Sequence, residues 1–108
     1  MSIDKNILIV FLKSISSASH QIVKLKPDSY MIGRDPDCDI VVADPFVSRK
    51  HAKIFYRDGK WFIEDVGSKN GTYVDGEDIR GRGAIELKED MEIIMGFSVL
   101  IIKGFEES

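Results

Sequence analysis

The amino-acid sequence predicts an all-β protein built as a β-sandwich. Ile and Val together supply 23 of its 108 residues, against 5 Leu and 4 Ala, and β-branched side chains suit a pleated, half-buried strand better than a helix. Short apolar or alternating runs follow one another along the chain, and no long stretch keeps a helical period. About ten short strands separated by turn residues are typical of a sandwich.

The first four strands are predicted from short apolar runs set off by turn residues. The opening strand contains the longest apolar run, Ile7 to Leu12, and a small polar loop over residues 14–19 follows it. The four runs lie at Asn6–Lys13, Gln21–Leu25, Ser29–Ile32 and Asp39–Val42.

Two Asp-Gly pairs predict tight hairpin turns. Asp58-Gly59 lies between two aromatic-rich runs, and Asp75-Gly76 follows another strand-like run. A type I′ turn needs a positive φ at both central residues, which these residue types tolerate. The remaining strands are expected at Ala52–Arg57, Lys60–Asp65, Thr72–Val74, Ile85–Glu86, Glu92–Gly96 and Ser98–Lys103, and residues 104–108 are expected to form a frayed end.

Length and composition predict one domain over residues 1–108, without linker or repeat. The net charge of −3 disfavours generic binding to nucleic acid or to an anionic membrane. Cys38 alone forms no internal disulfide, and with His20 and His51 it supplies too few ligands for a structural zinc site. The start of the chain, Met1–Lys5, does not resemble a signal peptide. We therefore expect a cytoplasmic monomer without metal or cofactor.

Two possible sites are weak on residue pattern alone. Ser48, His51 and Asp65 have the residue types of a hydrolytic triad, but geometry defines a triad and the flanking-glycine pattern around a nucleophile is missing. The acidic run over residues 35–39 has carboxylates at the first, third and fifth positions of an EF-hand calcium loop. The sequence lacks the glycine required at the sixth position of such a loop and the glutamate required at the twelfth. The acidic run is therefore more typical of a polar turn, and the three residue types alone do not indicate a triad.

Three predicted loops, over residues 33–37, 45–51 and 67–72, carry residues suited to an anion. The guanidinium of arginine offers phosphate a planar fork, while hydroxyl and amide groups add neutral donors. Glycine permits backbone shapes that other residues resist. If the loops converge at one end of the sandwich, they form a pocket for a single dianionic group; the alternative is ordinary solvated surface charge. The relevant residues are Gly33, Arg34, Ser48, Arg49, Lys50, Lys69, Asn70 and Gly71.

The order of these residues resembles a known signature. Gly33-Arg34, then Ser48-Arg49-Lys50-His51, then Asn70-Gly71 follow the pattern Gly-Arg, Ser-x-x-His, Asn-Gly of forkhead-associated (FHA) domains. The likeness is densest over residues 32–76, and the flanking strands extend it to essentially the whole chain. The resemblance implies an eleven-stranded β-sandwich of the FHA/SMAD-like type with its binding loops at one end. It also implies a signalling module that recognises phosphothreonine in partner proteins without catalysis.

The resemblance assigns a role to each matching position. Arg34 and Ser48 would contact the phosphate, and Asn70 would bind the peptide backbone beside the phosphothreonine. Arg49 lies where a second phosphate or peptide contact is common. Lys69 departs from the family pattern, which often has Thr there; its ammonium could replace the contact as a point charge, or swing away. Three residues would be structural: Gly33, His51 and Gly71.

Phe46, two residues before Ser48, admits two interpretations. We expect it to pack the loop down, because large aromatic side chains are mostly buried. If it is exposed, it would offer an apolar surface to a peptide side chain downstream of the phosphothreonine.

The expected partner is another protein phosphorylated by a Ser/Thr kinase, because the one threonine of this chain, Thr72, lies inside the predicted fold. The alternative is a threonine supplied by a longer native protein. Two other functions stay open. The chain could be a structural or assembly module that binds partners without phosphate, since a fold alone does not decide function. It could also be a hydrolase if Ser48 and His51 lie within hydrogen-bond reach of each other.

Overall fold

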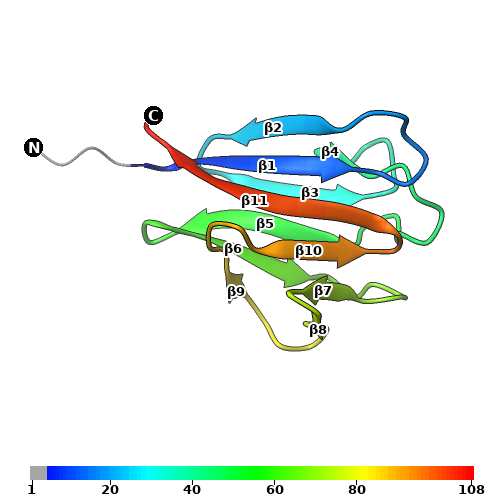
Figure 1. Ribbon diagram of the computed structural model, residues 1–108. Coiled ribbons are helices and arrows are strands. Elements are labelled where there is room, and N and C mark those ends of the chain that lie inside the picture. Colours follow the sequence, from blue (N-terminus) through cyan, green and yellow to red (C-terminus); the bar gives the residue numbers. More distant parts are fainter. Residues whose placement is uncertain (1–4) are drawn as a thin grey trace, which may run out of the picture.

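The computed structural model describes residues 5–108 and confirms the predicted β-sandwich (Figure 1). Its strands are β1 (Ile7–Lys13), β2 (Gln21–Leu25), β3 (Ser29–Gly33), β4 (Ile40–Val41), β5 (Ala52–Arg57), β6 (Lys60–Asp65), β7 (Thr72–Val74), β8 (Glu77–Asp78), β9 (Ile85–Glu86), β10 (Glu92–Met95) and β11 (Ser98–Glu106). One sheet has six strands in the order β2-β1-β11-β10-β7-β8, and the other has five in the order β4-β3-β5-β6-β9.

Buried and partly exposed side chains alternate along the strands, and the buried ones form the core between the two sheets. In β1, for example, Leu8, Val10 and Leu12 are buried while the residues between them are partly exposed. The facing sheet contributes Trp61 and Ile63 from β6 in the same way. Because a strand side chain changes face at every residue, this pattern fixes which side of each sheet faces the core.

Both Asp-Gly turns have the predicted conformation. Asp58 and Gly59 have φ values of 53° and 79°, and Asp75 and Gly76 have 47° and 87°. The second turn leads into β8, a strand that the sequence pattern did not indicate. β8 holds only two polar residues, so it has no apolar alternation, and it pairs with β7 because the turn reverses the chain.

The end of the chain differs from the expectation. Residues 104–106 were expected to fray, but they continue β11 and pair with β1, so that Ile7 lies opposite Glu106. Gly104, with a φ of 142°, lies where the register between the two strands shifts. A glycine after Lys103 resembles a strand end in the sequence, whereas here it marks a β-bulge inside a longer strand.

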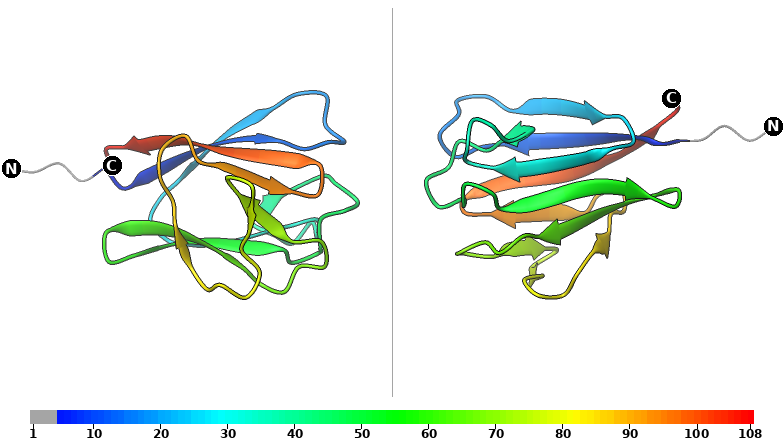
Figure 2. Two further views of the ribbon diagram at one scale, coloured as in Figure 1. Left: turned by 60° about the horizontal axis from the view of Figure 1, so that its bottom comes forward. Right: turned by 180° about the vertical axis from the view of Figure 1, so that it is seen from behind.

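The three polar loops lie together at the end of the sandwich away from the start of β1 and the end of β11 (Figures 1 and 2). They are the β3–β4 loop, the β4–β5 loop and the β6–β7 loop, and the β10–β11 turn lies at the same end. The order of the strands in the two sheets therefore brings together segments that are distant in sequence. Across residues 5–108 there is no helix with the length and apolar character needed to cross a membrane.

Candidate functional site

Gly33 brings the β3–β4 loop against the β4–β5 loop. It is buried at the end of β3, and a Cβ atom built on it would lie 1.9 Å from the backbone oxygen of Arg49. The next two residues bond across the same contact: the Arg34 amide donates to the Ser48 carbonyl (3.0 Å) and the Asp35 amide to the Arg49 carbonyl (3.3 Å). Only a residue without a side chain fits so close to another backbone.

His51 links the β4–β5 loop to the β6–β7 loop from below. Its ring is fully buried. Nδ1 accepts a hydrogen bond from the Ser48 amide (3.0 Å), and Nε2 lies 2.9 Å from the carbonyl oxygen of Gly71. Since Nδ1 accepts, Nε2 carries the proton and donates it to that carbonyl. A neutral imidazole thus ties together the backbones that carry Ser48 and Asn70.

We expect the stability of the fold to decrease as the pH falls through about 6.5, the ordinary pKa of histidine. Burial is the main reason that the pKa of His51 is lowered, with a smaller opposing effect from its bond to Gly71. The unfolded chain therefore binds a proton that the folded state resists, so unfolding is favoured between the unfolded and folded pKa values, by at most about 1.4 kcal/mol per pH unit. Urea unfolding of a His51→Gln variant should lack this slope, whereas His20→Gln, at an exposed position, should keep it. An identical slope in all three proteins would contradict the role of His51.

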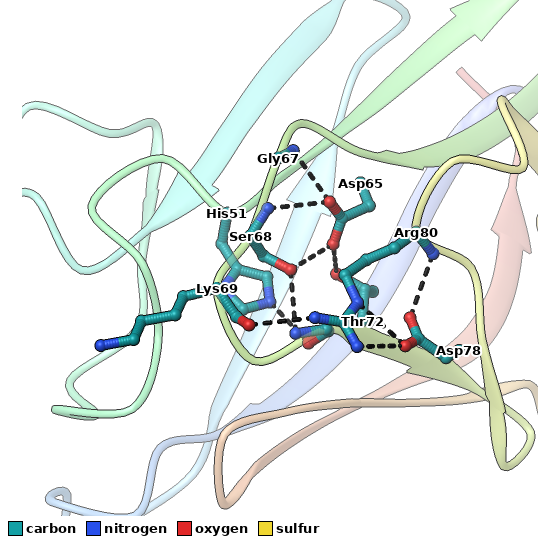
Figure 3. Close-up of polar contacts among 9 residues, drawn as sticks. His51, Asp65, Gly67, Ser68, Lys69, Thr72, Asp78 and Arg80 are labelled. Carbon is teal, nitrogen blue, oxygen red and sulfur yellow. Dashed lines mark hydrogen bonds and ion pairs between the residues drawn. The ribbon is translucent and has the colours of Figure 1, made fainter.

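Asp65 organises the β6–β7 loop from the end of β6 (Figure 3). Its Oδ1 accepts the amides of Gly67 (2.8 Å) and Ser68 (2.9 Å), and its Oδ2 accepts the hydroxyls of Ser68 (2.5 Å) and Thr72 (2.7 Å). Partial burial by itself would raise the pKa of Asp65, but the hydrogen bonds from Ser68, Thr72 and Gly67 outweigh it and lower the pKa below its usual value. An ionised carboxylate therefore fixes the shape of this loop.

Arg80 supports the same loop from outside. Its guanidinium donates to the Lys69 carbonyl (3.0 Å) and is itself held by Asp78, 2.7 Å away. In Figure 3 the side chain of Lys69 extends away from this network. The backbone of Lys69 is therefore held, while its ammonium remains available to a ligand.

The loops enclose a depression of about 330 Å³ on the surface. It collects every residue predicted to contact a phosphopeptide. The Arg34 guanidinium is steadied by a bond from Nε to the Val47 carbonyl (3.0 Å), and the Asn70 amide donates to the Phe46 carbonyl (2.8 Å). The lining residues are Arg34, Pro45, Phe46, Val47, Ser48, Arg49, Lys69 and Asn70. Gly33, His51 and Gly71 are buried and make the backbone contacts beneath it.

The charge in this depression is positive and uncompensated. Within residues 5–108, Arg34, Arg49 and Lys69 form no ion pair with a carboxylate, although six such pairs form elsewhere. The chain as a whole carries a charge of −3. Three unpaired cations at one concave spot create a local potential that attracts an anion.

The geometry does not favour hydrolysis. The Ser48 hydroxyl oxygen accepts from the Lys69 amide (3.0 Å), and the ring of His51 bonds two backbone groups. Asp65 bonds to its own loop instead of orienting the imidazole. A general base must be able to take the proton of its nucleophile, and His51 has no ring nitrogen left for that task.

The acidic run after Arg34 forms a polar turn. Asp35 accepts the Asp37 amide (2.9 Å) and Asp39 accepts the Met31 amide (2.8 Å). Each of these two carboxylates thus stabilises local backbone.

The expectation for Phe46 was wrong. Its side chain is 50% exposed and packs edge-to-face against Phe97 of the β10–β11 turn, with ring centroids 5.0 Å apart. Sequence reasoning also missed three residues: Asp44, which accepts the amides of Phe46 and Phe97, Arg80, which holds the β6–β7 loop, and Phe97, whose ring packs on Phe46. The local signal for each is a common polar or aromatic residue in a turn, and its role depends on a loop distant in sequence.

Comparisons with known proteins bear on the family and the fold of the chain. The family model for the FHA domain matches residues 30–96. The FHA domain-containing protein FhaB of Mycobacterium tuberculosis (strain ATCC 25618 / H37Rv) is 40% identical over 53 residues, which are 49% of this chain and 34% of FhaB. The oxoglutarate dehydrogenase inhibitor of Corynebacterium diphtheriae is 41% identical over 73 residues, 67% of this chain and 49% of that protein. The match thus spans half or less of these relatives.

A solved structure from a study of phosphothreonine-dependent FHA domain interactions has a similar fold. It superposes with a TM-score of 0.74 at 27% identity, over 88% of this chain and 95% of its own. The likeness extends beyond the motif residues to the sandwich as a whole.

Proposed function

The chain belongs to the FHA domain family, and on that premise we propose that it binds phosphothreonine-containing segments of partner proteins without catalysing a reaction. One observation carries the proposal: Arg34, Ser48 and Asn70, from three separate loops, line a single depression whose cations are unpaired. Phosphothreonine brings about −1.5 to −2 charges and three strong acceptor oxygens to such a place.

The residues of the depression suit a phosphate in complementary ways. Nε of Arg34 is held by Val47, and within the described residues both Nη groups have no partner, so they can donate to two phosphate oxygens. The Ser48 oxygen already accepts from the Lys69 amide, which leaves its hydroxyl proton to donate outward. Arg49 and Lys69 line the same depression and add positive charge, whose attraction extends over a screening length of about 8 Å.

Asn70 suits the peptide backbone beside the phosphate. Its Nδ2 donates to the Phe46 carbonyl, which fixes the plane of the amide. Its Oδ1 can then accept a peptide N–H without reorientation. Preorganised donors and acceptors lower the entropic cost of ordering an extended peptide.

The expected affinity is micromolar. Each charge-assisted hydrogen bond contributes roughly 1.5–3 kcal/mol net, and three or four of them, less the cost of ordering the peptide, leave a binding free energy of about −8 kcal/mol. The one threonine of the chain, Thr72, is fully buried and bonded to Asp65. The phosphothreonine therefore lies outside these 108 residues, and we propose that a partner protein phosphorylated by a Ser/Thr kinase supplies it.

The decisive test is a phosphothreonine peptide-library screen followed by titration calorimetry. The proposal expects micromolar binding of phosphorylated peptides and no measurable binding of their unphosphorylated forms. Equal binding of both forms would favour the phosphate-independent assembly module instead.

Replacing Ser48 by alanine should weaken phosphopeptide binding by about 1–2 kcal/mol, roughly 5- to 30-fold, because it removes one neutral donor. The Lys69 amide that bonds this hydroxyl belongs to an exposed residue, so water can satisfy it in the variant. Titration calorimetry measures the loss, and Ser29→Ala, at an exposed serine on β3, is the matched control. We expect this loss to be smaller than that caused by Arg34→Ala, and a larger loss would reverse the ranking of the Arg34 and Ser48 contacts.

A further inference from the structure

Among residues 5–108, the strand β2 forms the only long free edge of the sandwich. The two sheets have four edge strands, and three of them, β4, β8 and β9, are two residues long. β2 has five residues and pairs with β1 along all of them, while no described segment pairs with its other side. In Figure 1 it runs along the upper margin of the molecule. Its outward backbone N–H and C=O groups are therefore available to another strand.

The usual protections of an edge strand are weak in β2. Natural edges are guarded by a proline, a bulge, a short length or an exposed charge, because an open strand readily pairs with another chain. The sequence of β2, Gln-Ile-Val-Lys-Leu, contains no proline, and its pairing with β1 keeps one register throughout. Its one charged residue, Lys24, has its ammonium 3.3 Å from a carboxylate oxygen of Glu106. β2 is thus the least protected of the four edges that the structure describes.

Apolar surface reaches this free edge on the outer face of the six-stranded sheet. Ile22 is 52% exposed, and the register places it opposite Phe11 of β1, which lies opposite Ile101 of β11. The three side chains form one row across three strands, because residues opposite each other in an antiparallel sheet share a face. A further strand beyond β2 would cover the exposed end of this row.

The sequence of β2 is complementary to itself in one antiparallel register. Val23 is its middle residue, so a two-fold axis through Val23 pairs all five residues with the same five of a second copy. Val23 then lies opposite Val23 of the second copy, and Gln21 lies opposite Leu25. On the outer face Ile22 lies opposite Lys24, so no like charges meet and the aliphatic part of Lys24 can cover the exposed Ile22.

We propose that two copies of this chain associate through β2, which joins their six-stranded sheets into one continuous twelve-stranded sheet. The occupant of the edge is a second copy because every residue of β2 has a compatible partner in its own sequence. Since the two β2 strands run antiparallel, the loops that carry Arg34 and Ser48 lie at opposite ends of the dimer. The inference therefore does not depend on what those loops bind.

The dimer is expected to be weak. A strand of five residues spans about 17 Å, and pairing along it buries less than the roughly 1,600 Å² of a standard stable complex. We expect a dissociation constant of about 10–500 µM. The monomer is then the dominant species in dilute solution, and the dimer forms where the local concentration is high.

Sedimentation equilibrium of the wild-type chain from about 5 µM to 1 mM tests the association. We expect the average mass to rise from the 12.2 kDa of one chain toward twice that value. A mass that stays at 12.2 kDa over the whole range overturns the proposal.

A charge placed on the edge tests where the contact lies. Ile22→Lys sets an ammonium opposite Lys24 of the second copy, and the two-fold axis makes this happen twice, so the dissociation constant should rise about 5- to 30-fold. Val41→Lys is the matched control, because Val41 is a 41% exposed residue on the edge strand β4. It should leave the dimer unchanged. An equal loss in both variants, or none in either, would place the contact elsewhere and overturn the inference.

Disulfide cross-linking tests the register, and it does so even if the lysine variant fails to fold. In a Cys38→Ser background, Val23→Cys places two thiols directly opposite each other, with Cα atoms about 4.5–5.5 Å apart, a distance that a disulfide spans. Ile22→Cys places its two thiols on diagonal positions, about 7–8 Å apart, where a disulfide does not form without backbone movement. We expect a covalent dimer from Val23→Cys alone. Cross-linking of Ile22→Cys alone, or of neither variant, overturns the β2 contact as described.

The dimer and the proposed function can fail separately. β2 contributes no residue to the phosphate depression, so Ile22→Lys should bind a phosphothreonine peptide within about twofold of the wild type. A dimer that forms only in the presence of the phosphopeptide would assign the association to the loops and overturn the inference. Equal binding of phosphorylated and unphosphorylated peptides overturns the proposed function and leaves the β2 dimer standing.

Discussion

Replacing Arg34 by alanine is expected to weaken binding of a phosphothreonine peptide by about 2–5 kcal/mol, a loss of roughly 30- to several-thousand-fold. Arg34 is the one lining residue with a guanidinium steadied by a backbone carbonyl and two Nη groups without partners among residues 5–108. Its removal deletes a bidentate contact, and less of the negative charge of the phosphate is then neutralised by the protein. Titration calorimetry on the phosphorylated peptide measures the change directly.

Two control variants make this prediction specific. Arg57→Ala removes an equal charge from the β5–β6 end of the molecule, where Arg57 lies over the rings of Phe55 and Phe62, and it should leave the affinity unchanged. Arg34→Lys keeps the charge but loses the planar fork, so most of the affinity should still be lost. If Arg34→Ala binds as tightly as the wild type, Arg34 is not part of the site.

Replacing Gly33 by alanine is expected to lower the free energy of unfolding by at least about 3 kcal/mol. The added Cβ atom would lie 1.9 Å from the Arg49 carbonyl oxygen, which is backbone and cannot rotate away. Either β3 or the β4–β5 loop must move, and the bonds from Arg34 to Ser48 and from Asp35 to Arg49 would be strained or lost with it. The midpoint of urea unfolding measures the effect.

The matched control is Gly81→Ala. Gly81 has a φ of +74° but open space around its Cβ position, so alanine there costs only the left-handed strain of about 1–2 kcal/mol. The difference between the variants isolates the steric contact at Gly33. Equal unfolding midpoints would show that the two loops do not approach as closely as described.

The strands could be predicted from the sequence because their causes are local. Alternating Ile and Val mark a buried face, and Asp-Gly pairs mark the reversals at residues 58–59 and 75–76. β8 could not be predicted, since two polar residues become a strand only by pairing with β7. The bulge at Gly104 was missed for a similar reason: its conformation is set by the register of β11 against β1.

The candidate site, like the strands, could be predicted only in part from the sequence. The residues of the depression could be found because they occur in a recognisable order, although their convergence depends on the sheet topology. The exposure of Phe46 contradicted a general rule about aromatic residues, because that rule takes no account of Asp44, which fixes the loop from beneath. Asp44 and Phe97 lie 53 residues apart and meet only in the folded chain.

The place where β1 begins and β11 ends has a practical consequence. Ile7 and Glu106 pair side by side, at the end of the sandwich away from the loops that carry Arg34, Ser48 and Asn70. A tag or surface linker attached at either strand end would therefore hold the molecule by the end of the sandwich opposite these loops, so that the loops face away from the support. The support would then not obstruct the capture of phosphorylated proteins that we propose for these loops.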